Sequence, residues 1–438
     1  MKNFFLLNIT FYLLHFTSFS QLIPRLISGP MQGYTTATSL KIWLLAKDVK
    51  KISVELSNEN EKYSLEANTD SCTIYNEFSP AAFSFENLKP NTNYEVLVKL
   101  DKHEVRDKKM ISVKTLSEEN VQDFSFLLGS CAFMPSKFLK PFYPKIYKRI
   151  FKSMSKNPAD FMLWLGDNLY YRPKHYGSVK GMEQCQIRTR KFNQIDHFLK
   201  SMPQYAIWDD HDYGPNDSDK DFPLKDSSLA IHKKFWANSF FGTNEIPGIF
   251  SNFRMYDCEF FLLDNRFYRT NPNAENATIL GENQLNWFLE NLKKSTAVFK
   301  FVAVGSQIVN ENTPHERYAE FSSERKKIFD FIRENKISGV IFLTGDIHHS
   351  VLMKSDSLCS YPIYDFTCSP LTSVVHNVHP YEFENRQVVK GKIAITYNFG
   401  KIRVEGKEGE RECIIETYNA KGEKIWDYVI QEKELQCR

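Results

Sequence analysis

Four short segments of the sequence carry side chains that bind metal ions in proteins. They offer a thiol, a phenol, an amide, an imidazole and several carboxylates, namely Cys131, Asp167, Tyr170, Asp210, Asn216, Asp346 and His348. Carboxylate and phenol oxygens with imidazole nitrogen suit iron, manganese or zinc, whereas further carboxylates or an amide oxygen suit calcium or magnesium. A cation would also lower the pKa of the Cys131 thiol, so that it binds as thiolate. The residue types therefore indicate a metal site and leave the metals open.

This ligand chemistry fits phosphoester hydrolysis. Two or more cations can each bind a phosphate oxygen and convert a bridging water into hydroxide for in-line attack. His211 could protonate the leaving alkoxide as a general acid, and Arg266 could hold a phosphate with two hydrogen bonds. Plainer interpretations stay open: Cys131 as a small buried residue, His211 as a surface histidine in a polar loop, and Arg266 as the partner of a neighbouring carboxylate.

The elements that position these side chains are predicted strands. Apolar runs at 124–128, 161–165, 205–208 and 340–343 are typical of short buried strands. Each run ends directly before one of the chemical groups: Cys131, then Asp167, then the Asp-Asp-His-Asp run at 209–212, then Asp346. In open α/β sheets, ligands bind beyond the carboxyl ends of the strands. Four such ends in one chain predict a shared cluster at the edge of a sheet.

The chain divides into two parts. Residues 21–117 contain short alternating strands at 40–45, 52–56, 83–85, 94–100 and 110–115, which predict a β-sandwich with a spacer or lid role rather than an independent binding module. After a polar linker at 117–122, helical patterns at 144–154, 182–200, 229–241, 282–293 and 324–335 alternate with strands, including one at 300–304. This alternation predicts an α/β sheet. Strands at 392–397, 402–405 and 412–418 close the chain.

The N-terminus and the composition indicate where the protein works. Residues 1–20 have one early lysine, an apolar run and small residues near the end, which predicts a cleaved secretory signal and export to a periplasm or the exterior. The apolar run is too short to span a bilayer and holds Asn8 and His15, and no later stretch could span one. A net charge of +3 without a basic stripe argues against nucleic acid as a partner. We expect a monomer.

The eight cysteines do not form the dense pattern of a disulfide scaffold. In an exported protein some of them could pair. Cys359 with Cys368 and Cys413 with Cys437 are the nearest candidates in sequence, and the connectivity stays open.

Six ordered motifs resemble the PhoD-like alkaline phosphatases, which belong to the calcineurin-like metallophosphoesterases. The motifs are Gly-Ser-Cys131, Gly-Asp167-Asn-Leu-Tyr170, Trp208-Asp-Asp-His-Asp212 with Asn216-Asp217, Leu263-Asp-Asn-Arg266, Gln284-Leu-Asn-Trp287-Phe-Leu289 and Thr344-Gly-Asp346-Ile-His348. The resemblance covers nearly the whole chain after residue 20. Residues 85–94 also resemble the fibronectin type III turn that leads to the tyrosine corner.

The resemblance implies a fold and a metal cluster. The expected fold is α/β, a four-layer α/β/β/α metallophosphatase sandwich over 118–438 with a β-rich C-terminal extension, preceded by a fibronectin-III-like β-sandwich over 21–117. The expected cofactors are ferric iron and calcium, with other divalent metals possible. Iron would be held by Cys131, Tyr170 and His348, calcium by Asp210, Asp346 and Asn216, and Asp167 would bridge them. His211 would be the acid histidine. The assignment of Asp210 rather than Asp209 as the calcium ligand is a choice between adjacent carboxylates.

Two departures from the family pattern concern Asp212, where glutamate is usual, and Asn265, where threonine or serine is common. The central ligand types are all present, so we expect an exported metallophosphoesterase acting on small-molecule or lipid phosphoesters. Its substrates would be phosphomonoesters, phosphodiesters or both, with a phospholipase-like diesterase as the main alternative. A binding protein on a retired phosphatase scaffold is the second hypothesis.

Overall fold

The computed structural model describes residues 23–105, 111–135, 146–312, 316–378 and 380–437. The predicted signal segment at 1–20 lies outside these ranges. No helix within them has both the length and the apolar character needed to cross a membrane.

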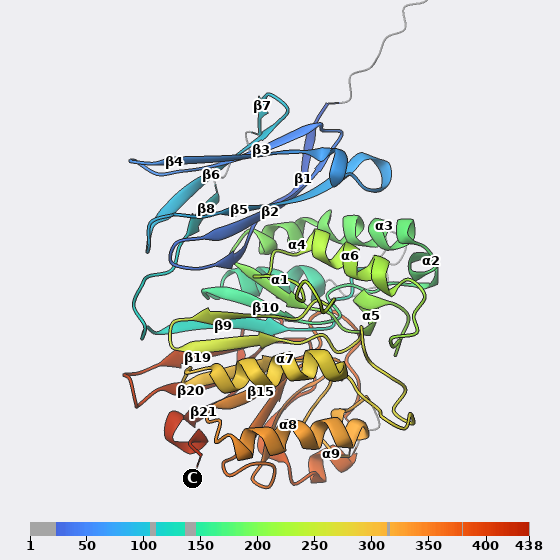
Figure 1. Ribbon diagram of the computed structural model, residues 1–438, viewed down its shortest axis with the longest axis vertical. Coiled ribbons are helices and arrows are strands. Elements are labelled where there is room, and N and C mark those ends of the chain that lie inside the picture. The colour runs from blue at the N-terminus through green and yellow to red at the C-terminus, as the bar shows by residue number, and fades with distance from the viewer. Residues whose placement is uncertain (1–22, 106–110, 136–145, 313–315, 379, 438) are drawn as a thin grey trace, which may run out of the picture.

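The N-terminal part consists of two sheets that share one hydrophobic core (Figure 1). One sheet has the order β1 (Arg25–Thr35), β2 (Leu40–Lys47) and β5 (Phe78–Phe85). The other contains β4 (Lys62–Asn68), β3 (Lys51–Ser57), β6 (Asn93–Leu100) and β7 (His103–Glu104), with β8 (Ile111–Lys114) also paired to β6. Two 3-10 turns, Thr69–Ser71 and Tyr75–Glu77, lead into β5. Side chains along β6 alternate between core and solvent, as the sequence pattern predicts.

Two larger sheets form the rest of the molecule. The first has the order β11 (Gln204–Ile207), β10 (Phe161–Leu165), β9 (Phe124–Gly129), β19 (Asn398–Glu405), β20 (Glu412–Asn419) and β21 (Lys424–Gln431). The second has the order β12 (Ser251–Met255), β13 (Cys258–Leu262), β14 (Phe299–Ala303), β15 (Val340–Thr344), β17 (Ile363–Thr367), β16 (Ser350–Ser355) and β18 (Val388–Ala394). Strands β9 to β11 are parallel to one another, as are β13, β14, β15 and β17. The protein is therefore a mixed α/β structure with several sheets.

Buried phenylalanines join the inner faces of the two larger sheets. The Phe126 ring of β9 lies 5.2 Å from Phe260 of β13 and 5.3 Å from Phe301 of β14, measured between ring centroids. Phe161 of β10 lies 5.3 Å from Phe260 and 5.8 Å from Phe253. Because aromatic side chains bury large apolar areas, this layer fixes the two sheets face to face.

Helices cover the outer faces of both sheets (Figure 1). Helices α1 (Ile146–Ser155), α3 (Val179–Arg190), α4 (Asn193–Leu199) and α6 (Lys225–Phe235) lie between the first sheet and the N-terminal sandwich. Helices α7 (Gly281–Lys294) and α8 (Ser322–Glu334) cover the second sheet, where Phe288 packs on Phe261 and Phe329 on Phe342. The short helices are α2 (Pro173–Tyr176), α5 (Asp210–Tyr213) and α9 (Pro380–Glu384), and 3-10 turns cover Tyr318–Phe321 and Glu432–Leu435.

Two predicted helices and one predicted strand differ from the structure, and the strand predicted at 392–397 is observed as β18 at Val388–Ala394. The helix predicted at 182–200 is two helices, because Phe192 adopts an extended backbone with φ −77° and ψ 119°. The helix predicted at 229–241 spans Lys225–Phe235 and ends where Trp236 turns extended. The Ala237 carbonyl beyond that end accepts a hydrogen bond from the Tyr34 backbone N–H, a contact with the sandwich that no local pattern could predict. All eight cysteines are free, so neither candidate pair forms a disulfide.

Candidate active site

The predicted strand ends meet at one edge of the two larger sheets. Cys131 follows β9, Asp167 follows β10, Asp210 opens α5 after β11, and Asp346 follows β15. Cys131, Asp167, Asp346 and His348 all have left-handed backbones, with φ of 57°, 52°, 69° and 61°. This conformation is strained for residues other than glycine and persists only where surrounding contacts impose it. Strain at four of the predicted ligands marks this edge as a functional site.

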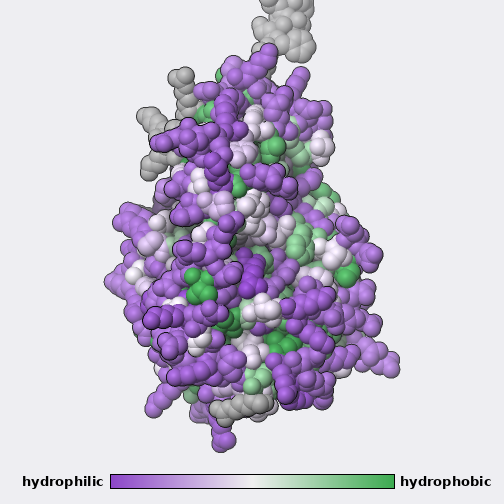
Figure 2. All heavy atoms as spheres, turned by 60° about the vertical axis from the view of Figure 1, so that its left-hand side comes forward, coloured by the Kyte–Doolittle hydropathy of each residue, from purple (hydrophilic) through white to green (hydrophobic). Residues whose placement is uncertain are grey.

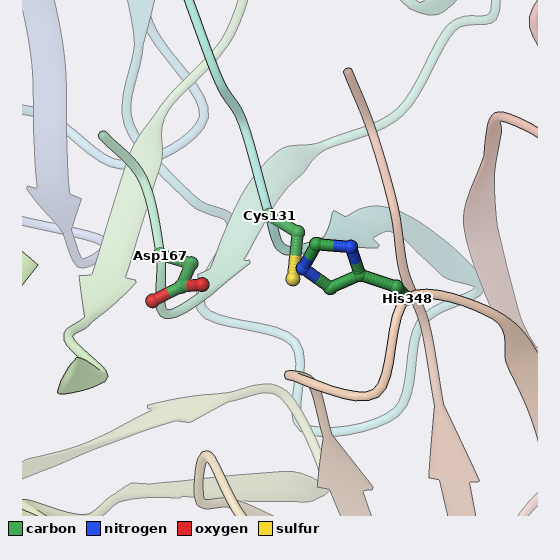
Figure 3. A group of neighbouring side chains, drawn as sticks. All are labelled: Cys131, Asp167 and His348. Atoms are coloured by element: carbon green, nitrogen blue, oxygen red, sulfur yellow. The ribbon is translucent and has the colours of Figure 1, made fainter. Parts of the chain in front are cut away.

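The first ligand group consists of Cys131, Asp167 and His348. One ligand atom from each lies within 4.8 Å of the other two. Figure 3 shows the three side chains converging from separate segments, with the Cys131 sulfur beside the imidazole of His348. The Cys131 side chain is fully buried, and burial together with the carboxylates of Asp167 and Asp346 raises its thiol pKa well above the ordinary value. Without a cation this cysteine stays a thiol.

His348 presents one ring nitrogen to this group. Its Nδ1 is hydrogen-bonded to the Val374 carbonyl, so Nδ1 carries the proton. The other nitrogen, Nε2, is left with a lone pair and lies 3.2 Å from the Tyr170 hydroxyl. A carbonyl that fixes the tautomer and the ring orientation is the usual support of a metal-binding histidine. The His376 ring stacks on His348 at 4.2 Å and restrains the ring further.

The second ligand group consists of Asp167, Asp210 and His211, again within 4.8 Å of one another. The Asp210 carboxylate accepts hydrogen bonds from the backbone N–H groups of His211 and Asp217, both at 2.8 Å. Asp167 Oδ1 accepts from the His211 N–H at 3.2 Å, whereas Asp167 Oδ2 is buried and has no partner among the described residues. Asp167 belongs to both groups and so occupies the position of a bridging ligand.

The electrostatics of the cluster fit a bound cation. Burial, and after it the charges of Asp210, Asp209 and Asp212, raise the pKa of Asp167 well above its usual range. Burial and neighbouring carboxylates do the same to Asp346. Buried carboxylates this close cannot all be charged unless a cation compensates them. The unpartnered Asp167 oxygen and the mixed sulfur, nitrogen and oxygen donors therefore suit metal ions.

Asp209 and Arg266 form an ion pair behind this cluster. Asp209 Oδ1 lies 2.5 Å from the Arg266 guanidinium and accepts a hydrogen bond from Asn265 at 2.7 Å. Arg266 is fully buried, also pairs with Glu316, and lies outside the residues that line the cavity described below. The structure thus places Arg266 as a brace for carboxylates, which is the plainer of the two interpretations of its sequence. Asp209 faces the arginine, and Asp210 faces Asp167.

Asp212 connects the loops that carry the ligands. Its Oδ1 accepts from the backbone N–H groups of Asp209 at 2.7 Å and Asp167 at 3.3 Å, and its Oδ2 accepts from Asn168. Burial raises its pKa to about 8. Aspartate is shorter than the glutamate that is usual at this position, and here its carboxylate joins the ends of β10 and β11 by accepting hydrogen bonds from both. The sequence did not indicate this role.

A cavity of about 640 Å³ opens onto the cluster. Its lining includes Asp210, His211, Asp346 and His348 from the predicted set, and also Asn216. Asn216 is an exposed residue of this lining. His211 lies beside the Tyr170 ring at 4.2 Å, and burial lowers its pKa from the ordinary value. His211 thus borders the space where a substrate would sit.

The sequence predictions missed several lining residues, among them one arginine, one glutamate and one histidine that could take part in chemistry. Arg269, Glu316 and His376 all border the cavity. The nearest signal for Arg269 is the motif that ends at Arg266, three residues before it. Glu316 and His376 lie in segments without a strand end or a motif, and only the tertiary structure brings them to the site.

Comparisons with known proteins concern the family and the fold of the chain. A family model described as PhoD-like phosphatase matches residues 126–413. Alkaline phosphatase D of Bacillus subtilis (strain 168) is 24% identical over an alignment of 316 residues, and the match covers 60% of this chain and 52% of that protein. The chain thus spans about half the length of this relative. A solved structure of PhoD superposes with a TM-score of 0.72 at 17% identity, covering 92% of this chain and 88% of that one, which shows the fold.

Proposed function

The chain belongs to the PhoD-like phosphatase family, and from this premise we propose that it is an exported, metal-dependent phosphoester hydrolase. The observation that carries the proposal is the pair of ligand groups that share Asp167 at the edge of the sheets. A single carboxylate that belongs to two groups is the arrangement that a two-metal hydrolytic centre requires.

The proposed metals are ferric iron and calcium, with other divalent metals as the alternative. Cys131, Tyr170 and His348 supply the soft and mixed donors that suit iron, whereas Asp210 and Asp346 supply the carboxylates that suit calcium. Asn216 is kept as a candidate on the calcium side. When bound, the metals supply Lewis-acid polarisation of the phosphate and a water of lowered pKa.

The protein's own residues bind and orient the substrate around this centre. His211 borders the cavity beside Asp210, and we assign it the transfer of a proton to the leaving-group oxygen. Arg266 serves as a positioning residue, because its guanidinium is engaged by the carboxylates of Asp209 and Glu316 and does not itself line the cavity. The fixed hydrogen bond from His348 Nδ1 to Val374 keeps Nε2 directed at the cluster.

The finer features of the fold belong to the same proposal. The two face-to-face sheets with helices on both outer faces would be the four-layer metallophosphatase sandwich, spanning 118–438. The N-terminal part, 21–117, would be of the fibronectin type III kind. In support, the Tyr94 hydroxyl accepts a hydrogen bond from the Lys89 backbone N–H at 2.9 Å. A bond from tyrosine to backbone a few residues upstream is the mark of a tyrosine corner.

Hydrolysis of two model substrates tests the proposal. Purified protein should release p-nitrophenol from p-nitrophenyl phosphate, from bis-p-nitrophenyl phosphate, or from both. The ratio of the two rates separates a monoesterase from a diesterase. A folded protein that contains metal and turns over neither compound would contradict the proposal. Export is tested separately, by fractionating cells that produce the full chain and sequencing the N-terminus of the mature protein.

A further inference from the structure

Arg269 is held rigidly at the wall of the cavity. It lies on the loop after β13, and its backbone N–H donates to the Arg266 carbonyl at 3.1 Å. Its Nη2 donates to Glu316 Oε1 at 2.9 Å, and its guanidinium lies 4.7 Å from the centre of the Phe321 ring. Its side chain is 3% exposed. The position of this cation is therefore fixed by an ion pair and an aromatic face.

One amino group of this guanidinium is left without an acceptor. Nη1 of Arg269 is buried and has no hydrogen-bond partner in the part of the chain that the structure describes. Buried donors of arginine are almost always satisfied, since leaving one unpaired costs the full desolvation of that group. Arg266 differs, because its guanidinium is shared between two carboxylates, Asp209 and Glu316. An acceptor is therefore missing at Arg269 and not at Arg266.

The side chain of Arg269 also lies at the wall of the cavity. Arg269 borders the same cavity as Asp210, His211, Asp346 and His348. Among the described lining residues it is the one arginine, and there is no lysine; the other ionisable ones are aspartates, glutamates and histidines. A substrate anion lying against the metal ligands therefore meets one permanent cation of the protein, and that cation is Arg269.

We propose that Arg269 binds a terminal phosphate oxygen of the substrate through Nη1 and thereby favours phosphomonoesters over phosphodiesters. This inference rests on the proposed function of the same site. A monoester presents three terminal oxygens, so one remains for Arg269 when two face the metal ligands. In a diester that third position carries an ester group, which has neither the charge nor the accepting strength of a terminal oxygen.

The matched variants are Arg269→Gln and Arg254→Gln. Arg254 is an exposed arginine on β12 that does not border the cavity. Arg269→Gln should raise both the KM for p-nitrophenyl phosphate and the inhibition constant of inorganic phosphate by about 10-fold or more, the loss expected for one charged hydrogen bond. Its KM for bis-p-nitrophenyl phosphate should change by less than about 3-fold, and Arg254→Gln should match the wild type. Arg269→Lys should recover part of the phosphate affinity.

Two outcomes would overturn the assignment. One is an unchanged phosphate inhibition constant in Arg269→Gln, and the other is an equal loss for both substrates. If Arg269→Gln fails to fold, as judged by circular dichroism, Arg269→Lys is compared with the wild type instead. A rise of about 3-fold in its phosphate inhibition constant, without a change for the diester, supports the assignment, and an unchanged constant overturns it. If the wild type turns over neither substrate, the proposed function fails on its own, and calorimetric titration with inorganic phosphate decides the role of Arg269. Binding that is lost in Arg269→Gln supports the role, whereas equal binding, or none in the wild type, refutes it.

Discussion

Asp209 and Asp210 are adjacent carboxylates with opposite environments. Asp209 caps α5 and pairs with the buried Arg266, and burial raises its pKa to about 6 despite that arginine. Asp210 turns instead toward Asp167 and the cavity. The sequence predicted a ligand at this strand end but could not choose between the two residues, because the choice depends on an arginine more than fifty residues later in the chain.

Because Asp209 pairs with Arg266 whereas Asp210 faces Asp167, the amide variants of these two residues should have opposite phenotypes. Asp210→Asn should lower turnover by about 100-fold or more, since the metal centre contributes several kcal/mol to the reaction. Its metal-free form should be less stable than the wild type by only about 1 kcal/mol, because the amide keeps one of the two oxygens that accept backbone hydrogen bonds. Asp209→Asn should retain metal and lose about 3 kcal/mol of stability, since a buried arginine loses a partner. Metal analysis and urea unfolding in chelator check both variants. The reverse pattern would contradict the assignment.

Cys131 is predicted to select the metal of its group. Cys131→Ser should lose iron while the carboxylate side keeps its metal, because a serine hydroxyl does not ionise to an anionic ligand as a thiol does. Elemental analysis of the purified variant provides the measurement. Cys72→Ser serves as the control, since Cys72 is a partly buried cysteine of the N-terminal sandwich. Unchanged iron content in Cys131→Ser would mean that Cys131 is a buried structural residue and not a metal ligand.

At the level of elements, the strands that carry the site were predictable and their surroundings were not. The strand at Phe161–Leu165 was predicted with the observed bounds, because a fully apolar run is bounded by Gly166 and has no competing pattern. The end of α6 at Phe235 lies where Lys234 and Ala237 accept hydrogen bonds from the sandwich, which is far away in sequence. Site residues follow the same rule. Asp167, Asp346 and His348 could be predicted because they follow strand ends, whereas only the tertiary structure brings Glu316 and His376 to the site.

Helix α6 carries a buried histidine that predicts acid sensitivity. His232 is 1% exposed, packs against Trp208 and Phe241, and has no hydrogen-bond partner for either ring nitrogen among the described residues. Burial, reinforced by Arg190, lowers its pKa from 6.5 to about 3. The unfolded chain therefore binds more protons than the native state between these values, so stability is lost as the pH falls below 6.5.

His232→Leu should remove this part of the acid sensitivity. Between about pH 7.5 and about pH 4.5, the free energy of unfolding of the wild type should fall by about 2.5 kcal/mol more than that of the variant. Urea unfolding at the two pH values gives both numbers. His197→Gln, an exposed histidine of α4, should behave as the wild type. Equal pH dependence in His232→Leu and the wild type would show that this histidine is charged or hydrated in the native protein.

Over the whole molecule, the N-terminal sandwich is packed onto the helices that cover the first large sheet. The indole Nε1 of Trp43 donates to the Lys234 carbonyl at 2.8 Å, and the Arg190 guanidinium lies 6.0 Å from the Trp43 ring. The backbone N–H of Gly29 donates to Asp196, and that of Thr35 to the Tyr205 hydroxyl. The face in Figure 2 is mostly hydrophilic, with hydrophobic side chains in small separate spots. These contacts favour a structural role for the sandwich, close to that of a spacer.

Trp43 at this interface predicts cooperative unfolding. Trp43→Ala should cost about 3 to 5 kcal/mol, because a fully buried tryptophan is lost at the contact between the two parts. Trp43→Phe should cost less, since it keeps most of the apolar contact and loses the hydrogen bond. Scanning calorimetry should show one transition in the wild type and a lower melting temperature in Trp43→Ala. A melting temperature unaffected by Trp43→Ala would mean that the sandwich is an independent module.

The central claim is that the cluster around Asp167 is a metal centre that performs the hydrolysis. The most direct measurement is steady-state hydrolysis of p-nitrophenyl phosphate and bis-p-nitrophenyl phosphate before chelation, after chelation, and after iron and calcium are restored separately and together. Asp167→Asn serves as the variant that lacks the shared ligand. The account predicts that chelated protein is inactive, that activity returns when both metals are restored, and that Asp167→Asn stays inactive. Full activity of the chelated protein or of Asp167→Asn would contradict it.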